Sequence, residues 1–250
     1  MSLSPPTTRP TQTPQPPQLP QPARESVRKL LRDLGAQLER GSAALARQAP
    51  ERLATGIPDL DALLTGGFPP GRLSEITGPQ SSGRTSVALA LLTRATRRGE
   101  VVALVDAAQA FDPASAQAAG AALEQLLWVR PPEPRVAVRC CESLLHAHGF
   151  SLVVLDLASS APGSPLPAST WQRLARAAAG TGTTLVVLSL GRVTGAFADL
   201  ALSMQSTRAH FSCAPALLEG LEIQAVVDRH RSGPVQRAAA VCLSAAPRAA

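Results

Sequence analysis

Nine consecutive residues, Gly-Pro-Gln-Ser-Ser-Gly-Arg-Thr-Ser at positions 78–86, have the types and spacing of a loop that binds phosphate. The glycines Gly78 and Gly83 let the backbone curl so that its N–H groups point inward. A helix that begins directly after such a loop adds the positive end of its dipole. The pattern G-x-x-x-x-G-K-[ST] describes this arrangement, so the segment predicts a strand, a phosphate-binding loop and a helix.

One residue departs from that pattern, because Arg84 stands where lysine is required. The chain has a single lysine, Lys29, so the replacement could be neutral drift. Alternatively, the wide guanidinium fork cannot enter a phosphate cradle as a compact ammonium does. On that interpretation the loop is kept as a structural turn and ATP binding is impaired or absent. Binding without hydrolysis stays open, because the backbone N–H groups do not depend on the lysine.

The segments around this loop alternate between strand and helix. A strand with Leu73 and Ile76 precedes the loop, and a short helix that Pro58 begins and Gly66-Gly67 ends comes before it. Continuous apolar runs indicate a parallel sheet covered on both faces, that is, an α/β fold. The expected strands are residues 101–106, 126–129, 151–157 and 183–189. The expected helices are residues 113–124, 136–148 and 169–179. Ser169 or Thr170 can cap the last of these helices, and Gly180 can end it. Residues 201–205, 221–228 and 238–243 predict an antiparallel extension of the same sheet.

The composition divides the chain into four segments. Residues 1–22 contain eight of the 23 prolines and are expected to form a disordered, Pro-rich tail. Residues 23–50 carry leucines at helical spacing and predict an N-terminal helix, residues 51–245 the core domain, and residues 246–250 a short tail.

The charge is concentrated before the core. Residues 1–55 hold eight Arg or Lys and four Asp or Glu, whereas residues 56–250 hold sixteen and fourteen. The excess of basic residues in the N-terminal segment either attracts nucleic acid weakly or lies on a solvated face of a helix. The four cysteines lack metal-ligand spacing and are expected to be buried apolar residues. We expect a cytoplasmic protein, since no stretch predicts a signal peptide or a membrane span.

Several motifs around the loop stand in the order found in the RecA family, which the chain resembles over most of residues 50–190. The resemblance implies a RecA-like P-loop core, with Thr85 and Asp156 as Mg²⁺ ligands if Mg-ATP binds. The motifs are Thr55-Gly56, Leu60-Asp61, Gly66-Gly67, Gly71-Arg72, Glu75-Ile76, residues 105–113 and the apolar strand ending at Asp156. The implied nucleotide-binding residues are Gly78, Pro79, Gln80, Ser81, Ser82, Gly83, Arg84, Thr85, Ser86 and Asp156.

Other positions depart from the RecA pattern. The glutamate that activates water would stand at Ala108, and the Asn-Gln pair that senses the γ-phosphate would stand at Ser189-Leu190. General-base catalysis typically contributes about 10²–10⁴-fold, so we assign no catalytic residue and expect little ATP turnover. The two segments that match the DNA-binding loops of RecA, residues 158–167 and 191–197, lack the length and basic content to hold a strand.

The segment 226–234 matches the part of RecA that contacts the neighbouring subunit's ATP. Arg229 and Arg231 are either surface charges of a hairpin or contacts of this kind. His230, like His146 and His148, has no partner at ligand spacing, and we expect surface histidines.

Within the family, the Pro-rich N-terminus and the eroded catalytic positions make the chain most similar to ImuA, the RecA-like protein of bacterial mutagenesis cassettes, once labelled SulA-like. This resemblance implies a non-catalytic accessory role in the SOS response and translesion repair, with ATP and Mg²⁺ bound weakly if at all. The implied partners are an ImuB-like Y-family polymerase homologue, an error-prone replicative-type polymerase and RecA, with weak or indirect DNA contact. The alternatives are an active DNA-dependent ATPase or recombinase, and an inhibitor of cell division or of RecA filaments. The helix at 24–47 and the strands after residue 200 are the candidate partner surfaces.

Overall fold

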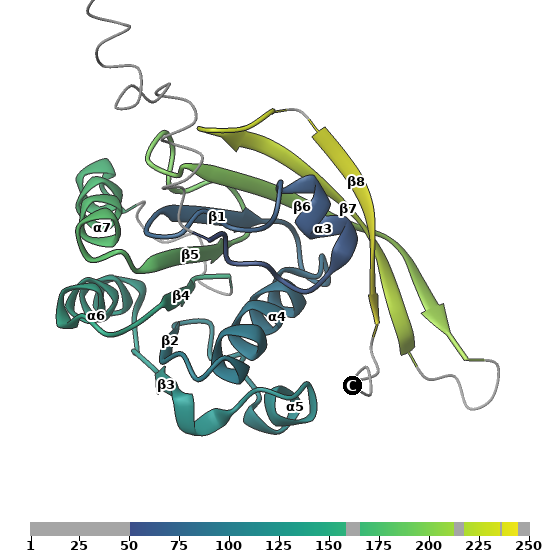
Figure 1. Cartoon of the computed structure of the whole chain (residues 1–250), viewed down its shortest axis with the longest axis horizontal. Coiled ribbons are helices and arrows are strands. Elements are labelled where there is room, and N and C mark those ends of the chain that lie inside the picture. Colours follow the sequence, from purple (N-terminus) through teal and green to yellow (C-terminus); the bar gives the residue numbers. More distant parts are fainter. Residues whose placement is uncertain (1–50, 159–165, 213–217, 236, 245–250) are drawn as a thin grey trace, which may run out of the picture. The chain divides into compact units, whose positions relative to one another are not determined.

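The computed structural model of the protein describes residues 51–158, 166–212, 218–235 and 237–244, which all lie in one unit, Pro50–Ala250. The predicted tail at 1–22, the helix at 23–50 and the tail at 246–250 lie outside the described residues. The helices are α3 (Pro58–Leu63), α4 (Arg84–Arg97), α5 (Pro113–Ala118), α6 (Pro134–Ala147) and α7 (Ala168–Thr181), with a 3₁₀ turn, η1 (Leu123–Gln125) (Figure 1). The strands are β1 (Leu73–Thr77), β2 (Val102–Asp106), β3 (Leu126–Val129), β4 (Leu152–Asp156), β5 (Thr184–Ser189), β6 (Leu200–Phe211), β7 (Leu218–His230) and β8 (Arg237–Ser244).

The strands of the described residues form one sheet in the order β3-β2-β4-β5-β1-β6-β7-β8. The strands from β3 to β6 in this order pair in parallel, whereas β7 and β8 pair antiparallel. The predicted α/β fold, with a mainly parallel sheet and an antiparallel C-terminal extension, is confirmed. The register pairs Asp106 with Asp156 and Thr77 with Ser189, so the carboxyl ends of β1, β2, β4 and β5 meet at one edge.

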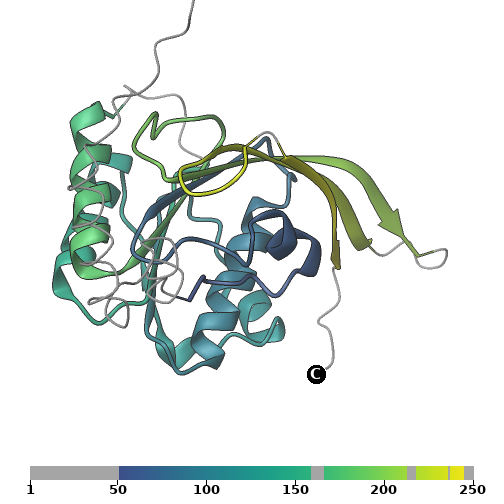
Figure 2. The ribbon, with the colours of Figure 1, turned by 45° about the horizontal axis from the view of Figure 1, so that its top comes forward.

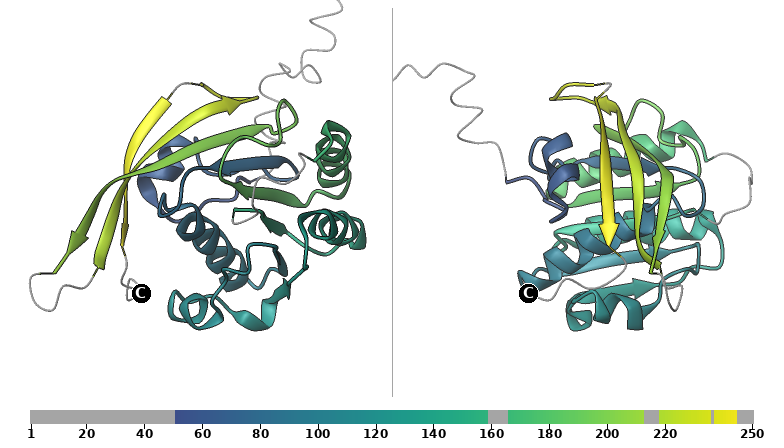
Figure 3. Two further views of the ribbon diagram at one scale, coloured as in Figure 1. Left: turned by 180° about the vertical axis from the view of Figure 1, so that it is seen from behind. Right: turned by 90° about the vertical axis from the view of Figure 1, so that its right-hand side faces the viewer.

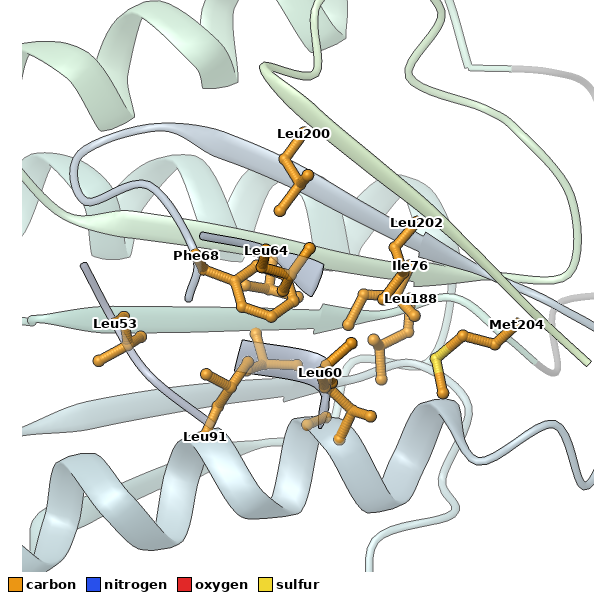
Figure 4. Close-up of a cluster of buried hydrophobic side chains, with 14 of the residues drawn as sticks. Leu53, Leu60, Leu64, Phe68, Ile76, Leu91, Leu188, Leu200, Leu202 and Met204 are labelled. Carbon is orange, nitrogen blue, oxygen red and sulfur yellow. The ribbon is translucent and has the colours of Figure 1, made fainter. Parts of the chain in front are cut away.

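Helices cover both faces of the parallel strands, as the unbroken apolar strands predicted. Figures 1 and 2 show α6 and α7 on one side and α4 on the other. On the α4 side, Leu60 and Leu64 pack with Ile76 of β1, Leu91 of α4 and Leu188 of β5 (Figure 4). The helix α3 that brings Leu60 there begins with proline at its first position and carries two acids in its first turn, both favourable at a helix N-terminus.

The antiparallel strands share their core with the P-loop helix. Ile223 of β7 and Val241 and Leu243 of β8 belong to the same buried cluster as Val87 of α4, and β8 contacts α3. Figure 3 shows the three strands β6, β7 and β8 running on from the parallel sheet. Much of their apolar face is therefore covered by α3 and α4, whereas Phe211 at the end of β6 is 58% exposed. The strands after residue 200 stay a predicted partner surface.

The C-terminal ends of two helices differ from the prediction because a different glycine follows each helix. α5 ends at Ala118 and not at residue 124, since Gly120 takes a φ of +90°. α7 follows Pro167 without a side-chain cap, so neither Ser169 nor Thr170 caps it. It ends before Gly182, whose φ is +75°, and not at Gly180.

The cysteines differ from one another. Cys141 is buried, which raises the pKa of its thiol, Cys140 is half-buried, and Cys242 is exposed. The prediction of buried cysteines is therefore wrong for Cys242, which lies on β8, while Cys213 lies outside the described residues. None of the described helices is long and apolar enough to cross a bilayer.

Candidate functional site: the P-loop and the carboxyl edge of the sheet

The loop from residue 78 to residue 83 connects β1 to α4, as the pattern predicted. Gly78 lies so close to β6 that a Cβ on it would be 2.3 Å from the carbonyl oxygen of Met204. Gly83 precedes α4 with a φ of +87°, and a Cβ there would lie 2.6 Å from Cδ1 of Leu243. Packing against the backbone of β6 therefore requires glycine at position 78, while at position 83 the positive φ favours it and Leu243 would have to shift to admit a Cβ.

Arg84 occupies the first position of α4, and its side chain turns back into the loop. The side chain is only 7% exposed. Its Nε donates to Oγ of Ser82 at 3.2 Å, and its Nη1 donates to the carbonyl oxygen of Ser189 at 2.6 Å. Burial lowers the pKa of the guanidinium, and the charge of Asp156 opposes that shift. The guanidinium thus links the loop to the end of β5 through the protein's own atoms.

The two predicted metal ligands line one pocket. Asp156, at the end of β4, and the exposed Thr85 face a pocket of about 200 Å³. The pocket is otherwise mostly apolar, with Asp112 and Ser115 as its other polar residues. Its apolar lining comes from Ala88, Leu89, Leu92, Leu104, Ala110, Phe111 and Leu188.

The carboxyl group of Asp156 is in a poor environment for a charge. Burial raises its pKa, and the neighbouring Asp106 raises it further. The N–H of Ala158, which donates to Oδ1 of Asp156 at 2.8 Å, and the charge of Arg84 act in the opposite direction. Asp156 therefore stays a candidate metal ligand through its position in the pocket.

The other predicted binding residues are distributed around the loop. Ser82 and Gly83 are buried with Arg84, whereas Pro79, Gln80 and Ser81 form its exposed tip. Ser86 is exposed on α4 and, unlike Thr85, does not line the pocket.

Asp106 organises the segment that follows β2, a role that the sequence did not indicate. Its carboxylate is fully buried and accepts the N–H groups of Ala110 and Phe111 and the indole N–H of Trp128. Phe111 contacts Trp128 edge to face at a centroid distance of 5.2 Å, and Arg130 stacks on the same indole at 5.0 Å. These contacts hold the segment that contains Ala108.

Glu75, part of the motif Glu75-Ile76, lies fully buried in β1. It accepts the backbone N–H groups of Val193 and Thr194 at 2.7 and 3.1 Å and the hydroxyl of Thr194 at 2.6 Å. A carboxylate in a strand expected to be buried was the signal that could have revealed this role, because a buried charge needs donors. The donors come from the segment between β5 and β6, residues 190–199, which we call the β5–β6 loop.

The prediction of a surface position for His230 is wrong. His230 is 6% exposed at the end of β7, with Nε2 at 3.5 Å from Nη1 of Arg52. Burial lowers the pKa of the imidazole, and the charge of Arg52 lowers it further. Arg231, by contrast, is exposed and pairs with Asp199. His146 and His148 are exposed, as predicted.

The sheet order, the loop and the helix behind it define a P-loop α/β protein. The sequence family described as the RecA N-terminal domain matches residues 31–185. The chain therefore belongs to the RecA family.

Curated relatives agree with this assignment. Protein RecA of Leptospira biflexa is 40% identical over 105 residues, which cover 42% of this chain and 27% of that protein. Protein RecA of Prochlorococcus marinus (strain SARG) is 34% identical over 146 residues, covering 58% of this chain and 38% of that protein. Protein RecA of Symbiobacterium thermophilum is 42% identical over 113 residues, covering 45% of this chain and 32% of that protein. The chain thus spans less than two fifths of the length of these relatives.

A solved structure shares the fold. The crystal structure of the RadB recombinase superposes with a TM-score of 0.60, covering 75% of this chain and 94% of that one at 23% sequence identity.

Proposed function

We propose that this RecA-family chain is a non-catalytic accessory protein of the DNA-damage (SOS) response that acts in translesion, error-prone repair through protein contacts. One observation carries the proposal. The guanidinium of Arg84, at the position where the P-loop pattern has its phosphate-binding lysine, donates to Ser82 and Ser189 of the chain itself. A P-loop whose cation is already held by the chain itself is less suited to bind a phosphate than one with a free lysine ammonium.

The residues present fit Mg-ATP poorly. Thr85 and Asp156 line one pocket, which is where they would have to be to hold Mg²⁺. Arg84, however, already donates one N–H of Nε to Ser82 and one N–H of Nη1 to Ser189, so only its remaining N–H donors could meet a phosphate. We therefore propose ATP binding that is weak at most, and no hydrolysis.

Two further positions support an accessory role. Ala108 supplies no carboxylate to activate water, and Leu190 supplies no amide at the end of β5. The β5–β6 loop is short and is tied to Glu75, so it is a poor candidate for a mobile DNA-binding loop. DNA contact would then be weak or would pass through partners.

The similarity to ImuA suggests those partners. They are an ImuB-like Y-family polymerase homologue, an error-prone replicative-type polymerase and RecA. Because much of the apolar face of β6 to β8 packs into the core, we propose residues 23–50 as the first segment to test for partner binding and the exposed end of β6 at Phe211 as the second. Removal of residues 1–48 should abolish capture of the ImuB-like partner, and full capture by that variant would assign the contact to the core.

The main test is ATP hydrolysis by the full-length protein with and without single-stranded DNA. We expect no DNA-stimulated turnover, and the same background in the Thr85→Ala variant. Arg84→Lys serves as the matched variant, because it restores the residue of the pattern and should tighten ATP binding without restoring turnover. Stimulated hydrolysis that Thr85→Ala abolishes would instead identify an active ATPase.

A genetic test separates the regulatory alternatives. Deletion in the organism that encodes the protein should remove damage-induced mutation and leave cell division normal. Filamentation of undamaged cells on overexpression would favour an inhibitor of division. Strand exchange by the purified protein would favour a recombinase.

A further inference from the structure

Two buried charged side chains meet at Ser189, the last residue of β5. Arg84 donates from Nη1 to the carbonyl oxygen of Ser189 at 2.6 Å. The hydroxyl of the same serine donates to Oε1 of Glu75 at the longer distance of 3.4 Å. Ser189 is therefore held from the P-loop side and from β1 at the point where the chain enters the β5–β6 loop.

Glu75 continues this set of contacts into the β5–β6 loop. Its carboxylate is 0% exposed and takes the N–H groups of Val193 and Thr194 together with the Thr194 hydroxyl. Nε of Arg192 lies 3.8 Å from Oε2 of Glu75 and balances its charge. A carboxylate removed from water is tolerated only where donors surround it, so the loop and the carboxylate depend on each other.

We propose that Arg84 and Glu75 form a built-in clamp that fixes the β5–β6 loop in one conformation without any nucleotide. The guanidinium holds the start of the loop at Ser189, and the carboxylate holds its middle at Val193 and Thr194. The clamp keeps two apolar side chains in a fixed place on the surface, Leu190 at 48% and Val193 at 44% exposure.

The clamp and a phosphate would act on the same guanidinium. Arg84 uses one N–H of Nε and one N–H of Nη1 for Ser82 and Ser189, so a phosphate in the loop would meet a side chain that the protein's own atoms already hold in place. The clamp therefore needs no nucleotide to order the loop. This inference concerns the conformation of the loop, and it holds whether or not the protein acts in repair.

Trypsin cleavage after Arg192 of the full-length protein tests the clamp, because this bond lies within the loop and Arg192 is exposed. We expect Arg84→Lys and Glu75→Gln to be cleaved there about ten times faster than the unmodified protein. Lysine keeps the charge but lacks the fork that spans Ser82 and Ser189, and glutamine has one acceptor atom where glutamate has two. Arg176→Ala, which removes an exposed arginine from α7, is the matched control and should change the rate less than twofold.

Hydrogen exchange distinguishes loosening of the loop from loss of the fold. In both clamp variants the amides of Val193 and Thr194 should exchange faster, while those of β4 keep their protection. Addition of Mg-ATP should leave the unmodified protein's cleavage rate unchanged or raise it. Cleavage of Arg84→Lys within twofold of the unmodified rate, an equal rise in exchange across β4, or protection of Arg192 by Mg-ATP would each overturn the proposal.

Discussion

Replacing Ile223 by alanine tests whether the antiparallel strands are part of the P-loop core. Ile223 is fully buried on β7, and two of its carbons lie 3.4 Å from the position that a Cβ on Gly83 would take. Truncating a buried isoleucine to alanine lowers the free energy of unfolding by about 2–5 kcal/mol, because transfer free energy is lost and a cavity remains. We use about 3 kcal/mol for this site.

Tryptophan fluorescence during urea denaturation can follow this change from the far face of the sheet. The chain has two tryptophans, and Trp171 of α7 is 2% exposed in the buried cluster beneath α6 and α7. With an m-value of about 2 kcal/mol per molar urea, a loss of about 3 kcal/mol moves the midpoint by about 1–2 M. Gln224→Ala, at the exposed neighbouring position, is the matched control and should stay within about 0.5 kcal/mol.

A tryptophan transition in Ile223→Ala that coincides with that of the unmodified protein would contradict a core shared by the two halves of the sheet. Such a result would mean that β6 to β8 unfold independently of the parallel sheet. A transition whose midpoint moves by the expected amount, with an unchanged m-value, would show that β6 to β8 and the P-loop unfold as one unit.

Three further changes probe single contacts. Gly83→Ala should destabilise the fold about 1–2 kcal/mol more than Gly99→Ala: both glycines have a positive φ, but only at Gly83 would the added Cβ meet a neighbouring atom within 4 Å. Urea denaturation of the two variants measures the difference, and equal values would contradict the packing of the loop. Asp106→Ala leaves three N–H groups without their acceptor and should cost about 3 kcal/mol; a change in the emission of Trp128 is the local readout, and an unchanged emission would argue against the contact. Because the pKa of His230 is lowered on folding, the folded state binds fewer protons than the unfolded chain, so stability should fall as the pH drops below about 6.5. His230→Gln should flatten that slope in thermal unfolding between pH 5 and pH 8, and identical slopes would contradict the assignment.

The parallel half of the fold could be predicted from the sequence because its signals are local. The apolar runs at 126–129 and 183–189 coincide with β3 and β5 to within one residue. The run at 183–189 is buried along its length in β5, so its neighbours need not be known, whereas the run at 126–129 is the half-exposed edge strand β3. The P-loop could also be predicted, from the spacing of its two glycines and from the helical pattern that comes directly after them.

The contacts of the site could not be predicted, because they join residues far apart in the chain. The partner of Arg84 is a carbonyl oxygen 105 positions away, and that of Glu75 is a loop more than 110 positions away. Every residue carries a backbone carbonyl and N–H, so no residue type identifies them in advance. The burial of His230 has the same origin, since it depends on Arg52 at the other end of the described chain.

The contact between α3 and β8 has a consequence for how the protein is made. Residues 58–63 emerge from the ribosome early, yet they contact a strand that begins at residue 237. Contacts of such long sequence separation form slowly, because a large loop must close before they give any stabilisation. During translation the apolar side chains of α3 and α4 that pack on β7 and β8 therefore stay uncovered until β8 has been synthesised. Nascent chains of this protein would present a surface of the kind that chaperones bind, and loss of the last strand would leave that surface permanently open.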